Sequence, residues 1–552
     1  MKKIVAAVAV TGLIAGGAAY ASAAQAAPSK AAKAAPVAAV AAPAAPTVAD
    51  DSASFTPKAI KWGKCGIPGF DELGAECGYL TVPLNYKKPT STKIKIAVSR
   101  IKAKVSADKY QGVMLTNPGG PGGSGLTLSV LGQYVPNNAG DAYDWIGFDP
   151  RGVGSSIPAL SCNGNYFKPP RPQYVPTTQK LETTWLNRSK GYAKACDKAG
   201  GALLDHVKTV DTINDMESIR KALGKSQINY YGFSYGSYLG QVYSTLHPTR
   251  VRRMVLDGIV DPRRVWYNAN LDQDKAFGKT SKIFFAWVAK NDATYKLGTT
   301  EAVVEAKYYA TLSKLAKKPA GGKLGAAEWN DVFVGAGYYV YGWEDTASLF
   351  AAAVNKGAFK PALTAYQEAN PLGKGADNGF AMYLATQCTD VAWPTYYKWR
   401  MDNWMLHATA PFLTWNNVWF NAPCLTWGSK PGTPVTVNGA KSPAMLLINE
   451  TFDAATPYTG AIEVRKRFPK SVLIEGVNGS THSGSLSGVS CTDDLIAAYL
   501  TNGSLPSRVA GNTSDVKCDP VPQPDPTAAA TLKSAAADPL SRVALQQLIG
   551  KR

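Results

Sequence analysis

The chain has 552 residues, of which 45% are hydrophobic and 18% charged. A chain of this kind can bury a large core, so the composition excludes a disordered protein and indicates a main domain with a second, inserted one. The formal net charge is +19 at pH 7, but the basic residues are scattered and form no run with interleaved aromatic residues. Nucleic-acid binding is therefore a weak alternative, and we expect a solvated basic surface that associates at most with an anionic cell wall.

Residues 1–26 have the pattern of an export signal. Lys2 and Lys3 form a basic start, residues 4–19 are apolar, and a small-residue cleavage site follows at 21–23 or 24–26. Three glycines interrupt the apolar stretch, which disfavours the alternative of a membrane anchor, because a stable span needs about 20 apolar residues. We therefore expect a secreted protein without a stable membrane anchor. Residues 27–54 are dominated by Ala and Pro and are predicted to be a linker or a removable pro-segment.

The cysteine content suits an oxidising compartment. There are eight cysteines, an even number, and none has the Cys-x-x-Cys spacing of a metal site. The simplest connectivity joins sequence neighbours: Cys65 with Cys77, Cys162 with Cys196, Cys388 with Cys424, and Cys491 with Cys518. The alternative, in which some of them remain buried thiols, stays open. No metal or cofactor motif is present, so we expect neither.

Strand-like runs dominate the first half of the chain. They lie at 78–84, 93–102, 112–117, 144–149, 228–231 and 251–257. Residues 212–223 carry apolar side chains at helical spacing, and the alternation of such segments with strands predicts an α/β fold with a mostly parallel central sheet. Strand-like sequence returns at 443–449 and 471–475. We therefore assign residues 55–260 and 442–519 to the α/β core.

Residues 261–441 are predicted to form a helical, aromatic-rich cap inserted into this core. Ten of the 13 tryptophans fall within the segment. Most of them should fill a helical core, and a few should line the substrate pocket, because large rigid rings give apolar walls at a low entropic cost. The last segment, residues 520–552, is a low-complexity tail whose role the sequence does not indicate.

The most informative motif is Gly-Phe-Ser-Tyr-Gly at 232–236, between a predicted strand and a predicted helix. This is the pattern of a nucleophile elbow, in which a strained turn presents the Ser234 hydroxyl at the top of a sheet. The five-residue string alone is common by chance. Its context makes it specific here, because a glycine-rich loop precedes it and an acid and a histidine follow in the order Ser, Asp, His.

A serine nucleophile needs an adjacent base, usually a histidine oriented by a carboxylate. His482 is the predicted base, because it follows the last predicted strand in a glycine-rich loop. Asp453 is the predicted acid, in the loop after the penultimate strand, and Glu450 is its rival. The remaining histidines precede the elbow, follow its helix directly or lie within the cap: His206, His247 and His407.

The glycine-rich run Asn-Pro-Gly-Gly-Pro-Gly-Gly-Ser-Gly follows the third predicted strand, where this fold places an oxyanion loop. We predict the amides of Gly120 and Tyr235 as the oxyanion hole, with Gly119 as an alternative to Gly120. The run lacks the Gly-Lys-Ser/Thr ending of a phosphate-binding loop. In the nearby Asp-Pro-Arg-Gly turn, Asp149 and Arg151 are expected to pair with each other in a structural role.

Four segments together resemble a known family: NPGGPGGSG at 117–125, WIGFDPRGVGSS at 145–156, YYGFSYGSYLGQVYSTLHP at 230–248 and VRRMVLDGIVDP at 251–262. They are similar to the secreted tripeptidyl aminopeptidases of Streptomyces-type bacteria, relatives of proline iminopeptidase among the α/β-hydrolases. The chain departs from the family at Thr481, since the family more often has glycine immediately before the catalytic histidine.

The resemblance implies an exported serine exopeptidase, expected to be a monomer, that releases short peptides, above all tripeptides, from free N-termini through an acyl-enzyme. Carboxylates of the cap would then hold the substrate ammonium. Glu344, Asp345 and Asp377 are candidates by position, but each is more simply a solvated surface acid, so the amine-binding residues stay unassigned. One alternative is an exported serine esterase or amidase acting on non-peptide substrates, which would not require a free amine. A non-catalytic binding protein is disfavoured, because serine, histidine and glycine loop are all present.

Overall fold

The computed structural model describes residues 51–527 except residue 53. The predicted export signal, most of the predicted linker and most of the predicted tail therefore lie outside the described residues. Within this part of the chain, none of the helices combines the length and the apolar character that crossing a membrane requires.

A ten-stranded sheet forms the centre of the fold, in the order β1-β2-β3-β5-β4-β6-β7-β8-β9-β10. The strands are β1 (Gly63–Lys64), β2 (Glu76–Pro83), β3 (Lys93–Ile101), β4 (Val113–Asn117), β5 (Asp144–Phe148), β6 (Ile228–Phe233), β7 (Val251–Asp257), β8 (Leu446–Glu450), β9 (Val472–Gly476) and β10 (Val516–Cys518). Neighbours from β1 to β5 pair antiparallel, and all pairings from β5 to β10 are parallel. The predicted α/β fold with a mostly parallel sheet is confirmed.

The predicted strands all form, with ends shifted by three residues or fewer. The two edge strands β1 and β10 were not predicted, because runs of two or three residues carry too little alternation to be recognised. Helices that pack beside the central strands are α2 (Thr209–Ala222), α3 (Tyr235–Leu246), α13 (Tyr458–Arg467) and α14 (Ser490–Asn502). Strands β4, β6 and β7 are almost entirely buried, as strands of a parallel sheet covered on both faces should be.

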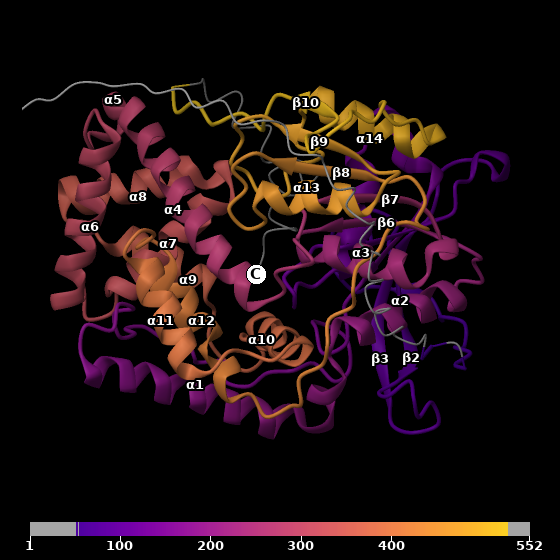
Figure 1. Ribbon diagram of the computed structural model, residues 1–552, viewed down its shortest axis with the longest axis horizontal. Coiled ribbons are helices and arrows are strands. Elements are labelled where there is room, and N and C mark those ends of the chain that lie inside the picture. The colour runs from indigo at the N-terminus through magenta and orange to yellow at the C-terminus, as the bar shows by residue number, and fades with distance from the viewer. Residues whose placement is uncertain (1–50, 53, 528–552) are drawn as a thin grey trace, which may run out of the picture. The chain divides into compact units, whose positions relative to one another are not determined.

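A long run of helices separates β7 from β8 in the sequence; we call residues 267–426 the helical insertion. It comprises α4 (Tyr267–Lys290), α5 (Asp292–Tyr295), α6 (Glu301–Lys317), α7 (Ala326–Tyr338), α8 (Trp343–Lys356), α9 (Lys360–Ala369), α10 (Asn378–Asp390), α11 (Tyr396–His407) and α12 (Thr414–Asn421). Figure 1 shows most of these helices on the left and the sheet on the right. Their core is aromatic, with fully buried indoles at Trp329, Trp343, Trp399, Trp415 and Trp419.

Helix α1 (Gln179–Gly200) precedes the elbow in the sequence but packs against α12 of the helical insertion. Trp185 on α1 stacks on Trp419 of α12, with ring centroids 5.7 Å apart. In Figure 1, α1 runs below α10, α11 and α12. Helix α1 lies in the part of the chain that we assigned to the core from the sequence, but it packs against the helical insertion.

Four disulfides form, and they are the bridges expected from neighbour pairing: Cys65–Cys77, Cys162–Cys196, Cys388–Cys424 and Cys491–Cys518. No free cysteine is left among the described residues. Each bridge closes a loop of 12 to 36 residues, and such bridges typically stabilise a folded protein by about 2–4 kcal/mol.

Candidate active site

Ser234 occupies a strained turn between β6 and α3. Its backbone dihedrals are φ 56° and ψ −123°, a combination that a non-glycine residue adopts only when its surroundings enforce it. The Ser234 amide donates to the Asp257 carbonyl oxygen at 2.8 Å, which ties the turn to the end of β7. A Cβ atom on Gly119 would lie 2.7 Å from the Ser234 Cβ, so this close approach requires glycine. The elbow and the glycine-rich loop are thus in direct contact.

His482 and Asp453 meet at the same edge of the sheet, where the parallel strands end. Asp453 follows β8, and His482 follows β9. The His482 Nδ1 atom lies 2.8 Å from Asp453 Oδ2 and 3.0 Å from Oδ1. An Nδ1–H that donates to the carboxylate leaves Nε2 as the basic nitrogen of the ring. Both side chains are buried.

The loop that carries Asp453 orients its carboxylate through three further donors. The amides of Ala455 and Thr456 donate to Asp453 Oδ1 at 2.9 and 3.0 Å, and the Thr456 hydroxyl donates to Oδ2 at 2.8 Å. The same hydroxyl lies 3.2 Å from His482 Nδ1. Thr456 therefore contacts both members of the pair. No motif in the sequence indicated this contact.

The rival acid, Glu450, makes different contacts. Its carboxylate accepts the amide of Thr481 and, at 2.8 Å, the amide of Val521. Burial raises the pKa of Glu450 to about 8. The carboxyl group thus ties the residue before His482 to the chain that follows β10. It holds the histidine loop in place, while Asp453 contacts the imidazole itself.

Sequence reasoning missed a third buried carboxylate, at Asp257. Its Oδ2 atom accepts the Ser485 amide at 2.8 Å, and burial raises its pKa to about 6. Because its carbonyl oxygen also accepts the Ser234 amide, one residue joins the elbow to the histidine loop. The available signal was its place at the carboxyl end of a predicted parallel strand, where functional groups of such sheets gather.

The helical insertion reaches the histidine loop at the end of α7. The His482 amide donates to the Tyr338 carbonyl oxygen at 2.8 Å, and the Val340 amide donates to Thr481 Oγ1 at 3.3 Å. The Tyr338 ring packs edge-on against the imidazole, with centroids 5.8 Å apart. Thr481 therefore contributes its hydroxyl to this contact. A contact through a backbone carbonyl leaves no signal in the sequence.

The predicted oxyanion donors differ in their availability. The Gly119 amide donates to Asn117 Oδ1 at 2.9 Å and is thereby occupied. Within the described residues, the amides of Gly120 and Tyr235 donate to no protein acceptor. A Cβ atom on Gly122 would lie 2.9 Å from the Tyr383 amide nitrogen, so the loop also packs closely against α10. The geometry favours Gly120 over Gly119.

Asp149 and Arg151 do not pair with each other as expected. The Arg151 guanidinium binds Asp215 on α2 through two bonds of 2.8 and 2.7 Å. The Asp149 carboxylate instead accepts the Ser124 hydroxyl at 2.6 Å and the Leu126 amide at 3.0 Å. The expectation was wrong because proximity in sequence favoured a local pair, whereas α2 offers the guanidinium a bidentate partner. Asp149 thus supports the end of the glycine-rich loop.

Comparison with known proteins adds to this geometry. Residues 112–484 match the family model described as alpha/beta hydrolase fold. The chain is 40% identical over 478 residues to a tripeptidyl aminopeptidase of Streptomyces coelicolor, covering 85% of this chain and 87% of the relative. The chain belongs to the tripeptidyl aminopeptidase family of α/β-hydrolases. It is also 31% identical to the serine protease Hip1 of Mycobacterium tuberculosis, covering 81% and 89%, and 28% identical to a carboxylesterase B of that species, covering 78% and 85%.

As a member of the tripeptidyl aminopeptidase family with an α/β-hydrolase fold, the protein is a serine hydrolase, and its relatives support a serine peptidase. The other histidines lie away from the Asp453–His482 pair. His206 ends a 3-10 helix, His247 follows α3 and packs on Tyr243, and His407 ends α11 beside Trp404. Burial lowers the pKa of His206 and of His407.

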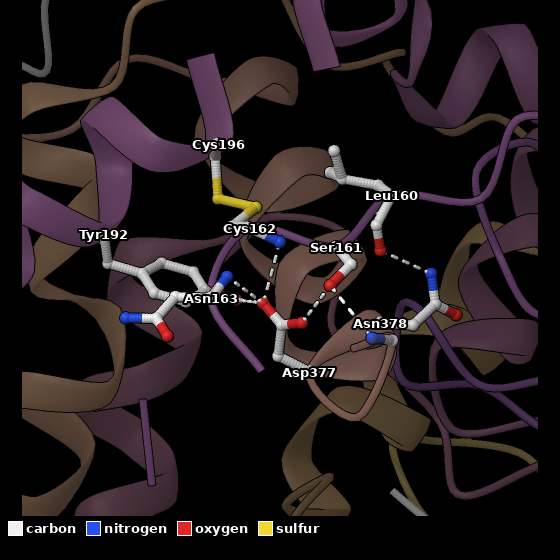
Figure 2. Close-up of a disulfide and its surroundings, with 9 residues drawn as sticks. Leu160, Ser161, Cys162, Asn163, Tyr192, Cys196, Asp377 and Asn378 are labelled. Carbon is white, nitrogen blue, oxygen red and sulfur yellow. Dashed lines mark hydrogen bonds between the residues drawn. A yellow bond between two sulfur atoms is a disulfide. The ribbon is translucent and has the colours of Figure 1, made fainter. Parts of the chain in front are cut away.

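The three carboxylates that are candidates for binding a substrate ammonium lie at the starts of two helices of this tripeptidyl aminopeptidase relative, α8 and α10. Glu344 and Asp345 lie in the first turn of α8, and Asp345 is exposed. Asp377 sits beside the Cys162–Cys196 disulfide, and Figure 2 shows donors converging on its carboxylate. The donors are the Ser161 hydroxyl at 2.6 Å, the Cys162 amide at 2.8 Å, the Asn163 amide at 2.7 Å and the Tyr192 hydroxyl at 2.7 Å. Asp377 is thus fully occupied in holding the disulfide loop.

The next residue, Asn378, joins the start of α10 to the core. Its side-chain nitrogen donates to the carbonyl oxygens of Gly152 at 2.8 Å and Leu160 at 2.7 Å, the second of which is drawn in Figure 2. Its oxygen accepts the Gly154 amide at 2.8 Å. Helix α10 is therefore anchored at its first residue and packs beside the glycine-rich loop, so it has a defined position relative to the elbow.

Proposed function

We propose that the protein is an exported serine exopeptidase that releases short peptides, above all tripeptides, from free N-termini, with Ser234, His482 and Asp453 as its catalytic triad. The observation that carries the proposal is the hydrogen-bonded His482–Asp453 pair at the sheet edge where the strained Ser234 elbow also lies. The tripeptidyl aminopeptidase and serine protease relatives support a peptide substrate.

The reaction would begin when the Ser234 hydroxyl attacks the scissile carbonyl carbon while His482 Nε2 takes its proton. Asp453 would hold the ring through Nδ1 and stabilise the imidazolium that forms. His482 would then give the proton to the leaving amine as the C–N bond breaks, which leaves the peptide esterified to Ser234. Water, deprotonated by the same nitrogen, would hydrolyse the ester and restore the serine.

The tetrahedral intermediates would place a negative charge on the former carbonyl oxygen. The amides of Gly120 and Tyr235 are the proposed donors to that oxygen, and their lack of a protein acceptor within the described residues supports this role. Because such donors are oriented before the reaction, each typically accelerates it by about 10²–10³-fold.

Export is part of the proposal. The disulfides support an oxidising compartment, since such bridges are rare in reducing cytosol. Secretion, the monomeric state and an association with an anionic cell wall remain predictions. A cell-fractionation experiment and the mass of the mature protein would test the first, and sedimentation would test the second.

The alternative is an exported serine esterase or amidase of the same fold that acts on non-peptide substrates. The carboxylesterase B relative keeps this alternative open. It differs from the proposal in one measurable property, because an esterase has no need for a free amino terminus.

The test compares three substrates with the purified protein: a tripeptide p-nitroanilide with a free amine, its N-acetylated twin and p-nitrophenyl butyrate. We expect kcat/KM to be highest for the free-amine peptide, and Ser234→Ala to lower it by about 10⁶-fold. A preference for the acetylated peptide or the ester would replace the exopeptidase by the alternative. Activity that survives in Ser234→Ala would contradict the proposed nucleophile.

A further inference from the structure

One buried carboxylate of the helical insertion has almost no partners. Asp274 on α4 is 1% exposed. Its Oδ1 atom accepts the Asn417 side-chain amide at 2.9 Å, and within the described residues no Lys or Arg forms an ion pair with it. Burial raises the pKa of Asp274 well above its usual range. A buried carboxylate normally has a cation or several donors, so this one lacks the partners that would favour its ionised form.

The surroundings of Asp274 offer acceptors and aromatic rings, and they leave a small empty space. Asn421 is 2% exposed, and within the part of the chain that the structure describes its side-chain oxygen has no hydrogen-bond partner. The cavity beside them, lined also by Tyr267, Trp393 and Trp399, has room for a group of the size of a water molecule. A primary ammonium has that size, carries three N–H donors and is attracted to aromatic faces.

The position of α4 relates Asp274 to the proposed triad. At the start of the helix, the Trp266 ring lies 5.7 Å from the ring of Tyr235, the residue after Ser234. Further along, the Phe277 ring lies 4.8 Å from the Tyr338 ring, which packs on His482. Asp274 lies between these two contacts, and only about 4.5 Å along the helix axis from Phe277. One end of α4 therefore lies near the elbow and a later part lies near the residues that contact His482, and Asp274 lies between these two positions on the helix.

Helix α10 gives a second, independent relation. Its Tyr383 packs against Gly122 of the glycine-rich loop. One turn later, about 6 Å along the axis, the Gln387 side-chain oxygen accepts the Asn270 amide at 3.4 Å. Asn270 precedes Asp274 by one turn of α4 and lines the same cavity. An extended tripeptide spans about 10 Å between its amine and its last carbonyl carbon.

We propose that Asp274 binds the N-terminal ammonium of the substrate, with the Asn421 side-chain oxygen as a second acceptor, and so sets how many residues lie between that amine and the bond cleaved at Ser234. The inference rests on the proposed function, since only an exopeptidase requires such a group. The bound ammonium would supply the opposite charge that the carboxylate lacks in the free protein.

The test uses the tripeptide p-nitroanilide and its N-acetylated twin with the full protein and Asp274→Asn, which keeps the side-chain shape but removes the charge. Truncating one partner of a buried charge pair typically costs about 10²–10³-fold or more in affinity. We expect a loss of this size in kcat/KM for the free-amine peptide and a loss below about threefold for the acetylated one. Asp272→Asn, on the same helix and paired with Arg264, is the matched control and should behave as wild type.

The outcomes separate the two proposals. A wild-type enzyme that cleaves both peptides equally well would overturn the proposed function and the inference with it. A wild-type preference for the free amine that persists in Asp274→Asn, or an equal loss on both peptides, would overturn only the role of Asp274. Labelling of Ser234 by a fluorophosphonate shows whether the variant is folded. Should it not fold, Asp274→Glu replaces it: a carboxylate displaced by one methylene should raise KM for the free-amine peptide alone, and an unchanged KM would overturn the inference.

Discussion

Two buried carboxylates of this protein, Asp453 and Asp274, have the same exposure but opposite environments. Asp453 accepts three hydrogen bonds from its own loop in addition to the His482 contact. Asp274 accepts one, from Asn417. Burial by itself therefore does not distinguish a carboxylate that is complete within the protein from one that is suited to a ligand. The number and kind of donors makes the distinction, because an ionised group without partners is costly inside a protein.

The largest effect should come from Asp453→Asn, which sharpens the contrast with Asp274. An amide in place of the carboxylate favours the wrong imidazole tautomer, and the same change in a serine protease triad lowers kcat by about 10⁴-fold. We expect a loss of this order on the free-amine peptide, the acetylated peptide and the ester alike, in contrast to the selective loss predicted for Asp274→Asn. Steady-state kinetics on the three substrates measure it.

The rival acid provides the control for that experiment. Glu450→Gln should lower kcat/KM by less than about tenfold, because Glu450 contacts the amide of Thr481 and not the imidazole. Should Glu450→Gln cost as much as Asp453→Asn, or should Asp453→Asn retain activity, the assignment of the acid would be wrong.

Some parts of the molecule could be predicted from the sequence and others could not. The strands and the Ser234 elbow were predictable because their signals are local: alternating apolar residues, and glycines at fixed offsets around the serine. The contact between Asp453 and His482 could be anticipated from the common edge at which parallel strands end. Whether these residues act as the predicted triad is a matter for the kinetics above.

The remaining features depend on contacts between distant segments. Asn417 and Asp274 are 143 residues apart, and no periodicity relates them. Asp377 was considered for the substrate amine because a charged residue is visible in the sequence, whereas the four donors that occupy it come from segments about 185 to 216 residues away. The number of donors that surround a buried carboxylate depends on the tertiary structure. From the sequence alone, Asp377 could therefore be a candidate, but nothing pointed to Asp274.

Asp377 tests whether the number of donors decides the role of a carboxylate, since a carboxylate with many donors should serve stability rather than selectivity. Asp377→Ala leaves four donors without their acceptor, among them the buried Tyr192 hydroxyl. We expect the free energy of unfolding to fall by about 2–4 kcal/mol, measured by denaturant titration, while the ratio of activities on free and acetylated peptides stays unchanged. Asp345→Ala, at an exposed position of α8, should change it by less than about 1 kcal/mol. A changed peptide preference in Asp377→Ala would return Asp377 to the candidates for amine binding.

The smallest effect concerns the pH dependence of stability through Glu450. Its pKa is raised from 4.5 to about 8 in the folded protein, chiefly by burial. A group with a raised folded-state pKa binds more protons when folded, so its contribution to stability is complete below about pH 4.5 and is lost as the pH rises through about 8. Glu450→Gln removes this titration, and it also costs about 1–3 kcal/mol because the Gln amide group cannot accept both backbone amides.

The difference in unfolding free energy between the wild type and Glu450→Gln should therefore be largest near pH 5 and shrink toward pH 8, then level off. Denaturant titrations of both proteins across this range measure it, and the titration of Asp257 cancels because both proteins contain it. A difference that is constant or grows with pH would show that Glu450 is ionised in the folded state. In that case Glu450, which accepts the amides of Thr481 and Val521, would be a second buried anion without a cation. A small number of donors at a buried carboxylate would then no longer be sufficient to identify a ligand site.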